Sequence, residues 1–93
     1  MIVEKKITIK NKLGLHARPA ALFVQIANKF DCDISVKKGK QKVNGKSIMG
    51  IMMLAAGKDD VIHIKANGEG ANKAVSELEE LLMGDLDKNG SVF

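Results

Sequence analysis

Two side chains near the start of the sequence are suited to phosphoryl chemistry. His16 and Arg18 lie in the run Gly14-Leu-His-Ala-Arg-Pro-Ala20. Imidazole is a nucleophile whose unperturbed pKa lies near physiological pH, so a neutral nitrogen is available to attack phosphorus. The planar guanidinium of Arg18 presents an array of donors that matches phosphate oxygens. This pair of residue types therefore indicates a phosphoryl acceptor beside a phosphate-binding cation.

Pro19 predicts where the helix behind this pair begins. Proline has no N–H and is tolerated only within the first turn of a helix, so the helix should begin at His16 or later. The N–H groups of Ala17 and Arg18 then lie at the helix start, where the dipole favours an anion. We expect His16 at or next to the N-cap, with Ala17 and Arg18 binding phosphate.

The residues alone leave a structural alternative open, in which His16 is an ordinary capping residue and Arg18 a solvated cation. A metal site is not expected, because His63 is distant in the sequence and no ligand pair has metal-binding spacing. His63 alternates with apolar neighbours and is expected on the wet face of a strand. No cofactor is implied.

Ser47 precedes a second, strongly apolar helical segment that runs to Leu54. Its hydroxyl can cap the N–H groups there, and a phosphate on it would meet the positive end of the helix dipole. A short surface helix cannot bury every side of such a segment. We expect Ile51 and Leu54 in the core. The predicted partner-docking patch beside His16 consists of Ile48, Met49, Met52 and Ala20.

The remaining pattern predicts an α+β fold of order βαββαβα. Three stretches alternate apolar and polar residues, as in antiparallel strands with one dry face. Their inward residues are Val3, Ile7 and Ile9, then Cys32, Ile34 and Val36, then Ile62, Ile64 and Ala66. A fourth strand is expected over about 40–43, across a Lys38-Gly39 turn. Helical spacing runs over 17–30, with Ala20 on its inward face, and over 71–83, where Gly84 ends the helix.

These elements predict an open-faced β-sandwich, a four-stranded antiparallel sheet with three helices on one face. We expect one domain over 1–93, with a folded core over 1–84 and a flexible tail over 85–93. The chain of 93 residues is 45% hydrophobic, which suits one compact domain. Its single Cys excludes an internal disulfide and favours the reducing cytoplasm, with Cys32 as a core residue.

Charge and composition narrow the classes of partner. The formal net charge is +4, but no Trp or Tyr is present to stack on bases, so direct nucleic-acid binding is not expected. A basic surface fits an acidic protein partner. No signal peptide or membrane-spanning stretch is predicted, and no membrane partner follows.

Two motifs resemble signatures of the HPr family, the phosphocarriers of the phosphoenolpyruvate-dependent phosphotransferase system. The run from Gly14 to Ala20 resembles the active-site signature, and Asn44-Gly-Lys-Ser-Ile-Met-Gly-Ile-Met-Met-Leu54 resembles the second signature. The element order matches to about Met83. The resemblance implies the HPr-like fold and a phosphoryl group carried on Nδ1 of His16, the pros position, with Arg18 steadying it.

The partners implied by this resemblance are phosphorylated enzyme I as donor and enzyme IIA domains, which serve sugar uptake, as acceptors. Ser47 matches a serine modified by HPr kinase/phosphorylase, which creates a site for a catabolite-control transcription regulator. The alternative function is a regulatory phosphoprotein, of the nitrogen-related branch or of carbon catabolite control, that acts by protein binding. A stand-alone enzyme is disfavoured, because a small open sandwich encloses little space. We expect a monomer.

Overall fold

The computed structural model describes residues 1–12 and 14–84, and within them the chain follows the predicted order βαββαβα. The strands are β1 (Ile2–Thr8), β2 (Asp33–Lys38), β3 (Gln41–Asn44) and β4 (Val61–Asn67). The helices are α1 (Ala17–Ala27), α2 (Ile48–Met53) and α3 (Ala71–Met83). The tail predicted over 85–93 lies outside the described residues.

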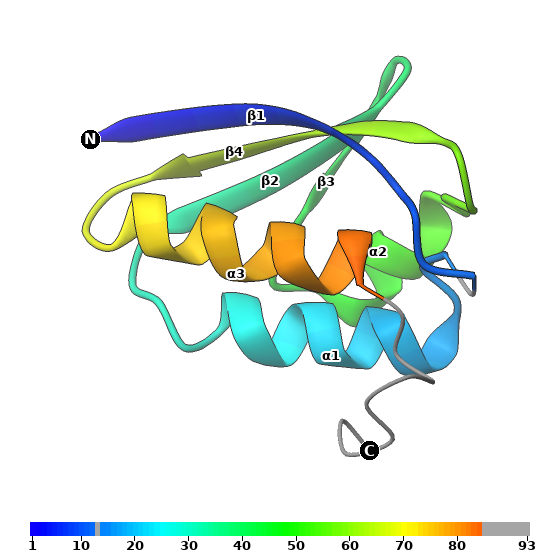
Figure 1. The fold of residues 1–93 in the computed structure, drawn as a ribbon. Coiled ribbons are helices and arrows are strands. Elements are labelled where there is room, and N and C mark those ends of the chain that lie inside the picture. The colour runs from blue at the N-terminus through cyan, green and yellow to red at the C-terminus, as the bar shows by residue number, and fades with distance from the viewer. Residues whose placement is uncertain (13, 85–93) are drawn as a thin grey trace.

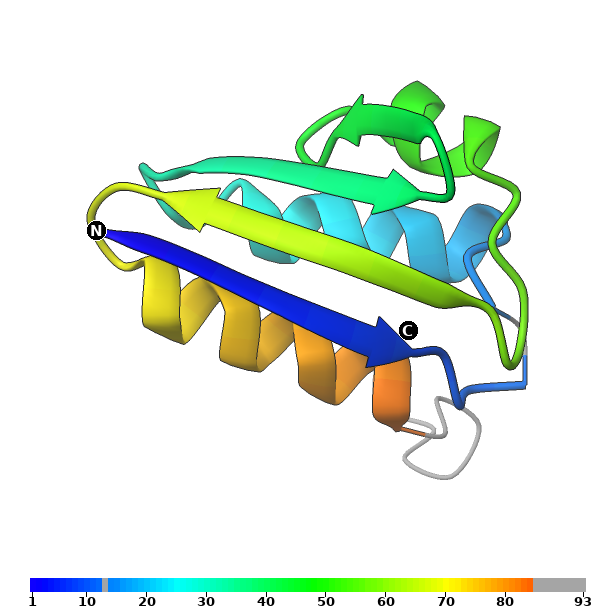
Figure 2. The same ribbon diagram turned by 90° about the horizontal axis from the view of Figure 1, so that it is seen from above.

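The strands form an antiparallel sheet of order β1-β4-β2-β3. The helices lie on one face of this sheet, which leaves its other face open (Figure 1). Seen from above, α1 and α3 run beneath the strands while α2 lies at the β3 edge (Figure 2). The predicted open-faced sandwich is therefore confirmed.

Alternation along the strands fills the layer between sheet and helices. Ile34 and Val36 of β2 face Ala66 and Ile64 of β4 in register, and all four are buried. The largest fully buried side chains from the helix layer and its loops are Phe23, Ile51, Leu54, Leu78 and Leu82. Cys32 is a buried free cysteine, as predicted for a core residue.

Two predicted element boundaries were wrong. Helix α1 ends at Ala27, because Lys29 N donates to Ile26 O and Phe30 N to Ala27 O, which tightens the chain into i→i+3 turns. The β2–β3 hairpin turns over Gly39 and Lys40, since Lys38 pairs with Gln41, so β3 begins one residue later than expected. Gly39 has φ +59°, the conformation that a two-residue hairpin turn requires at its first position.

Candidate phosphate-acceptor site

His16 is the N-cap residue of α1, and its side chain is exposed. Its backbone is extended, with φ −76° and ψ −172°, and Ala20 N donates the first helical hydrogen bond to His16 O at 2.8 Å. Within the described part of the chain, the imidazole makes no capping hydrogen bond. His16 therefore stands at the cap position without acting as a side-chain cap, and its side chain is open to solvent.

The start of α1 agrees with the prediction from Pro19. Ala17, Arg18 and Pro19 are the first three helical residues, so Pro19 occupies a position where no intrahelical donor is needed. Ala17 and Arg18 are exposed, whereas Pro19 is buried. The helix start thus presents the backbone N–H groups of Ala17 and Arg18 next to the exposed side chain of His16.

The loop before His16 is held by the last turn of α3. Lys10 N and Asn11 N both donate to Leu82 O, at 2.9 and 3.1 Å, and Asn11 Nδ2 donates to Leu81 O at 3.3 Å. These bonds also satisfy carbonyls that have no intrahelical donor at the end of α3. Asn11 is buried, and it is a site-supporting residue that the sequence analysis missed, because its partners lie 70 residues away.

A second anchor joins the same loop to the segment after α2. Leu15 N donates to Ala56 O at 2.8 Å, and the Leu15 side chain is only 2% exposed. The chain reaches Leu15 through Gly14, which has φ +59°. A Cβ on Gly14 would lie 2.6 Å from Gly57 Cα and 2.8 Å from Ala56 O. The buried Leu15 fixes the backbone immediately before the exposed His16.

Ser47 caps α2 as predicted, because its Oγ accepts a hydrogen bond from Gly50 N at 3.1 Å. Ile51 and Leu54 are buried, and the outward residues of α2 form an apolar patch. These are Ile48 (42% exposed), Met49 (72%), Met52 (45%) and Met53 (64%). Met53 was missed, because the uniformly apolar segment does not indicate which way each methionine turns. We call these four residues the α2 patch.

Ala20 requires a correction. It was predicted to belong to the docking patch, but it is 0% exposed. Its position one turn into α1 points it at the sheet, in agreement with its place on the inward face, so its side chain is unavailable to a partner.

The start of α1 and helix α2 lie at the same end of the molecule in both views (Figures 1 and 2), which places the α2 patch and His16 at that end.

A charged contact braces the segment that Leu15 binds. Lys38 Nζ donates to Leu54 O at 3.3 Å and to Ala55 O at 3.2 Å, and it lies 3.2 Å from Asp60 Oδ2. The same carboxylate accepts from Gly57 N at 2.8 Å. The Gly57 N–H and then the Lys38 ammonium lower the pKa of Asp60 below its ordinary value of 3.8. Asp60 therefore holds the turn beside Gly14 in its charged form.

Other predicted groups lie away from this site. His63 is exposed on the outer face of β4, and Cys32 is buried. Among residues 1–12 and 14–84, no three His, Cys, Asp or Glu side chains gather to hold a metal ion. None of the described helices is long and apolar enough to cross a membrane.

Comparison with known proteins finds relatives that match nearly the whole chain. The family model described as the PTS HPr component phosphorylation site matches residues 3–83. The phosphocarrier protein HPr of Pseudomonas putida is 48% identical over 85 residues, which cover 90% of this chain and 94% of that protein. The structure of a phosphocarrier protein HPr from Bacillus anthracis superposes with a TM-score of 0.84 at 47% identity, covering 87% of this chain and 96% of that one.

A relative of a second kind is equally informative. The HPr-like protein Crh of Bacillus subtilis is 46% identical over 77 residues, which cover 83% of this chain and 91% of that protein. Its crystal structure superposes with a TM-score of 0.72 at 42% identity, covering 89% of this chain and 95% of that one. That structure is described as a catabolite repression protein forming a dimer with a swapped domain.

Proposed function

Because the chain belongs to the HPr family of phosphotransferase-system phosphocarriers, we propose that His16 accepts a phosphoryl group from phosphorylated enzyme I and passes it to enzyme IIA domains. The observation that carries this proposal is the exposed imidazole of His16, which stands at the start of α1 without a capping hydrogen bond in the described structure. An imidazole engaged in capping the helix would be a poorer nucleophile, whereas this one is accessible to a partner's phosphoryl group.

The transfer step exchanges one bond to phosphorus for another. The lone pair of neutral His16 Nδ1 attacks phosphorus while the bond from phosphorus to the donor breaks, and the donor atom keeps that electron pair. His16 retains its proton on Nε2. Delivery to the next protein is the same step in reverse, with an acceptor group of that protein attacking phosphorus and Nδ1 leaving.

The start of α1 supplies the electrostatic stabilisation that the step needs. During transfer, the negative charge of the phosphoryl group is spread over its three equatorial oxygens. The N–H groups of Ala17 and Arg18 and the guanidinium of Arg18 are donors that such oxygens accept from. We assign Arg18 and Ala17 to phosphate binding and His16 to covalent acceptance.

The α2 patch provides the contact surface for successive partners. Ile48, Met49 and Met52 were expected there, and Met53 extends the same surface. Methionine side chains are flexible and polarisable, so they adapt to more than one partner. A small apolar interface also allows rapid release, which a carrier requires. We propose that enzyme I and enzyme IIA domains use this surface in turn, in the cytoplasm, with the chain acting as a monomer.

Mass spectrometry with phosphoenolpyruvate and enzyme I tests the acceptor. The chain should gain one acid-labile phosphoryl group, and His16→Ala should gain none. Arg18→Ala should still be modified, but about 10- to 100-fold more slowly, because a charge-assisted hydrogen bond is lost. His63→Ala is the matched control, since it removes the other exposed imidazole. Acceptance that persists in His16→Ala would reject the assignment.

A regulatory function is the second candidate, favoured by the likeness to Crh and by the position of Ser47. We propose that an ATP-dependent kinase phosphorylates Ser47, which is half-buried at the N-cap of α2 beside the exposed Ile48 and Met49. A phosphate there would sit at the positive end of α2, so the fold would survive while a charge enters the α2 patch.

Ser47→Asp should weaken enzyme I binding while leaving the melting temperature nearly unchanged, as measured by calorimetric titration and thermal unfolding. Ser76→Asp serves as the control, because Ser76 is exposed on α3. Equal dissociation constants for the unmodified chain and Ser47→Asp would count against the switch.

A further inference from the structure

The open face of the sheet carries a row of basic side chains at one level of all its strands. In register, Lys6 of β1 pairs with His63 of β4, His63 also pairs with Lys37 of β2, and Lys37 pairs with Lys42 of β3. Each of these side chains is exposed. We propose that this row, here called the basic row, docks an acidic helix of a partner protein.

In the described part of the chain, the lysines of the basic row lack the carboxylate partners that four of the other lysines have. Four lysines pair with carboxylates, namely Lys5 with Glu79, Lys10 with Asp59, Lys29 with Glu77 and Lys38 with Asp60. Among residues 1–12 and 14–84, no carboxylate lies within ion-pair distance of Lys6, Lys37 or Lys42. Like charges on directly opposed strand positions destabilise a sheet. An anionic partner would relieve that repulsion.

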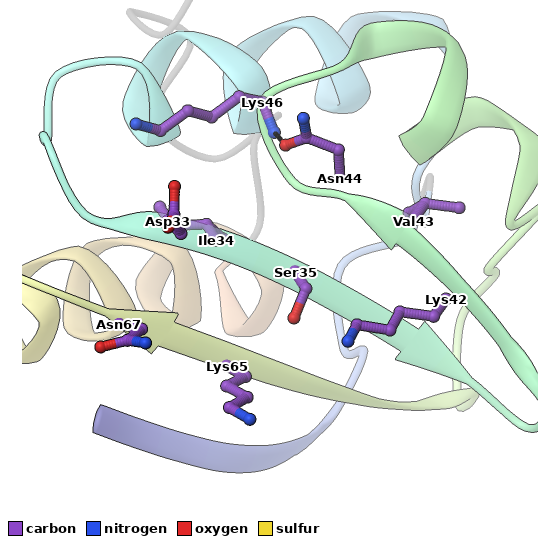
Figure 3. A pocket seen from close by; sticks show the side chains of 9 residues that line it. All are labelled: Asp33, Ile34, Ser35, Lys42, Val43, Asn44, Lys46, Lys65 and Asn67. Carbon is purple, nitrogen blue, oxygen red and sulfur yellow. Dashed lines mark hydrogen bonds between the residues drawn. The ribbon is translucent and has the colours of Figure 1, made fainter.

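Neighbouring side chains make the row part of a larger concave surface. Together with Ser35 and Lys65, the basic row lines a shallow hollow of about 580 Å³ on the open face. Figure 3 shows Ser35 of β2, Lys42 of β3 and Lys65 of β4 on this side of the sheet. Lys65 adds a further cation one step along β4, and Ser35 adds a hydroxyl that can donate a hydrogen bond.

Spacing favours a helix as the occupant. Side chains on adjacent strands stand about 4.5–5.5 Å apart at Cβ. Residues three or four apart on one helix face stand about 5–6 Å apart at Cβ, whereas alternate residues of an extended strand are about 6.6 Å apart. A helix crossing the strands can therefore place successive Glu or Asp side chains opposite Lys6, His63, Lys37 and Lys42.

The chemistry of the face disfavours nucleic acid. No Phe, Trp or Tyr side chain of the described residues lies on it, because Phe23 is buried in the core and Phe30 packs against the core cluster. Glu4 and Asp33 flank the basic row on the same face and would repel a continuous phosphate backbone. Exposed lysines are point charges without the fork that grips a phosphate. Carboxylates arrayed on a protein surface are the better match.

This surface and the start of α1 belong to different layers of the molecule. The basic row lies on the open face of the sheet, whereas α1 and α3 cover the other face (Figure 1). The inference does not depend on phosphoryl transfer.

Two synthetic peptides and two double variants test the proposal by NMR titration of the ¹⁵N-labelled full chain at about 0.15 M salt. One peptide of about 18 residues carries glutamates on one helix face at i, i+4, i+7 and i+11; the other spreads the same glutamates around the helix. The one-face peptide should shift the amides of Lys6, Lys37, Lys42 and His63. Lys37→Gln/Lys42→Gln should weaken its binding about fivefold or more.

The matched control is Lys58→Gln/Lys73→Gln, which removes two exposed lysines elsewhere and should change binding by less than about twofold. Equal weakening by both double variants would overturn the proposal, because overall charge would then explain binding. Equal affinity for the two peptides would overturn the helical match. Tighter binding of a single-stranded oligonucleotide at the same salt would replace the protein partner with nucleic acid.

Discussion

Gly14 combines a left-handed backbone with a position that has no room for a side chain. Its φ is +59°, and a Cβ there would lie 2.6 Å from Gly57 Cα. The close approach lets Leu15 N reach Ala56 O. The residue two positions before His16 is therefore constrained both by its own torsion and by a neighbouring backbone that cannot move aside cheaply.

Replacing Gly14 by Ala should lower the free energy of unfolding by about 3 kcal/mol, as the sum of left-handed strain and overpacking. Gly39→Ala separates the two contributions. Gly39 has the same φ, +59°, but no described atom lies within 4 Å of its Cβ position. That variant should lose only about 1–2 kcal/mol. Urea denaturation measures both, and equal losses would show that the close approach to Gly57 costs nothing.

For single residues, the sequence predicts those features that depend only on local covalent chemistry. Pro19 limits the start of α1 because a missing N–H is a property of one residue. The support role of Asn11 and the close contact of Gly14 with Gly57 were not predicted, because each depends on a backbone group brought close by the fold. Ala20 was placed on the docking patch by its nearness to His16 in sequence, and the direction of its side chain decided otherwise.

Helix α2 begins with the expected cap but ends in an unexpected way. Ser47 satisfies the amide of Gly50, whereas Ala55, just after the C-cap Leu54, has φ +49°. Helices commonly place glycine at this left-handed position, since a Cβ there is strained. Lys38 donates to the carbonyls of Leu54 and Ala55, so a side chain from β2 supports an end that lacks the usual residue.

Ala55→Gly should therefore raise the free energy of unfolding by about 0.5–1 kcal/mol, because relief of left-handed strain exceeds the added entropy of the unfolded chain. Thermal unfolding at neutral pH provides the measurement. Ala21→Gly, in the interior of α1, should instead lose about 1 kcal/mol. A loss in Ala55→Gly would show that the strain at this end is negligible.

Elements with a clear period were predicted well, including both ends of α3, but the end of α1 and the β2–β3 turn were wrong. Alternation in β1, β2 and β4 and helical spacing in α3 reflect burial of one face, which the sequence records directly. The α1 terminus at Ala27 and the Gly39-Lys40 turn depend on short-range hydrogen bonds that several residues can make. The direction of the methionines in α2 depends on packing against α1 and β3, which periodicity alone does not reveal.

Across the whole molecule, Asp60 joins elements that are distant in the sequence. It binds Lys38 from β2 and the Gly57 amide that lies beside Gly14. Its folded-state pKa is lowered, first by the Gly57 N–H and then by Lys38. A carboxylate with a depressed pKa stabilises the fold above its unfolded pKa, and that contribution disappears as pH falls through the folded value.

Asp60→Asn should reduce stability at pH 7, and its deficit relative to the unmodified chain should shrink as pH drops below about 4. Urea unfolding at pH 7, 4 and 2.5 gives the comparison. Asp31→Asn removes an exposed carboxylate that has no ion pair among the described residues, and it should show a smaller deficit at pH 7. A deficit for Asp60→Asn that stays constant with pH would contradict the ionic role.

Contacts between residues that are far apart in the chain cannot be predicted from the sequence alone. The basic row is dispersed over residues 6, 37, 42 and 63, so composition shows a modest net charge and no cluster. Strand order and register bring these residues to one level. Lys38 and Asp60 are likewise distant in the sequence, because Lys38 ends β2 and Asp60 lies just before β4.

The hydrogen bonds from Lys10 and Asn11 to Leu82 have a consequence for biosynthesis. Because the chain is synthesised from its N-terminus, the loop that leads to His16 is made early. The carbonyl groups that hold this loop are added about 70 residues later. Strand β1 likewise cannot pair until β4, its only partner in the described sheet, has been synthesised. A nascent or truncated chain that ends before Leu82 thus carries His16 without the hydrogen bonds that hold its loop, and this early segment is among the last to take its final shape.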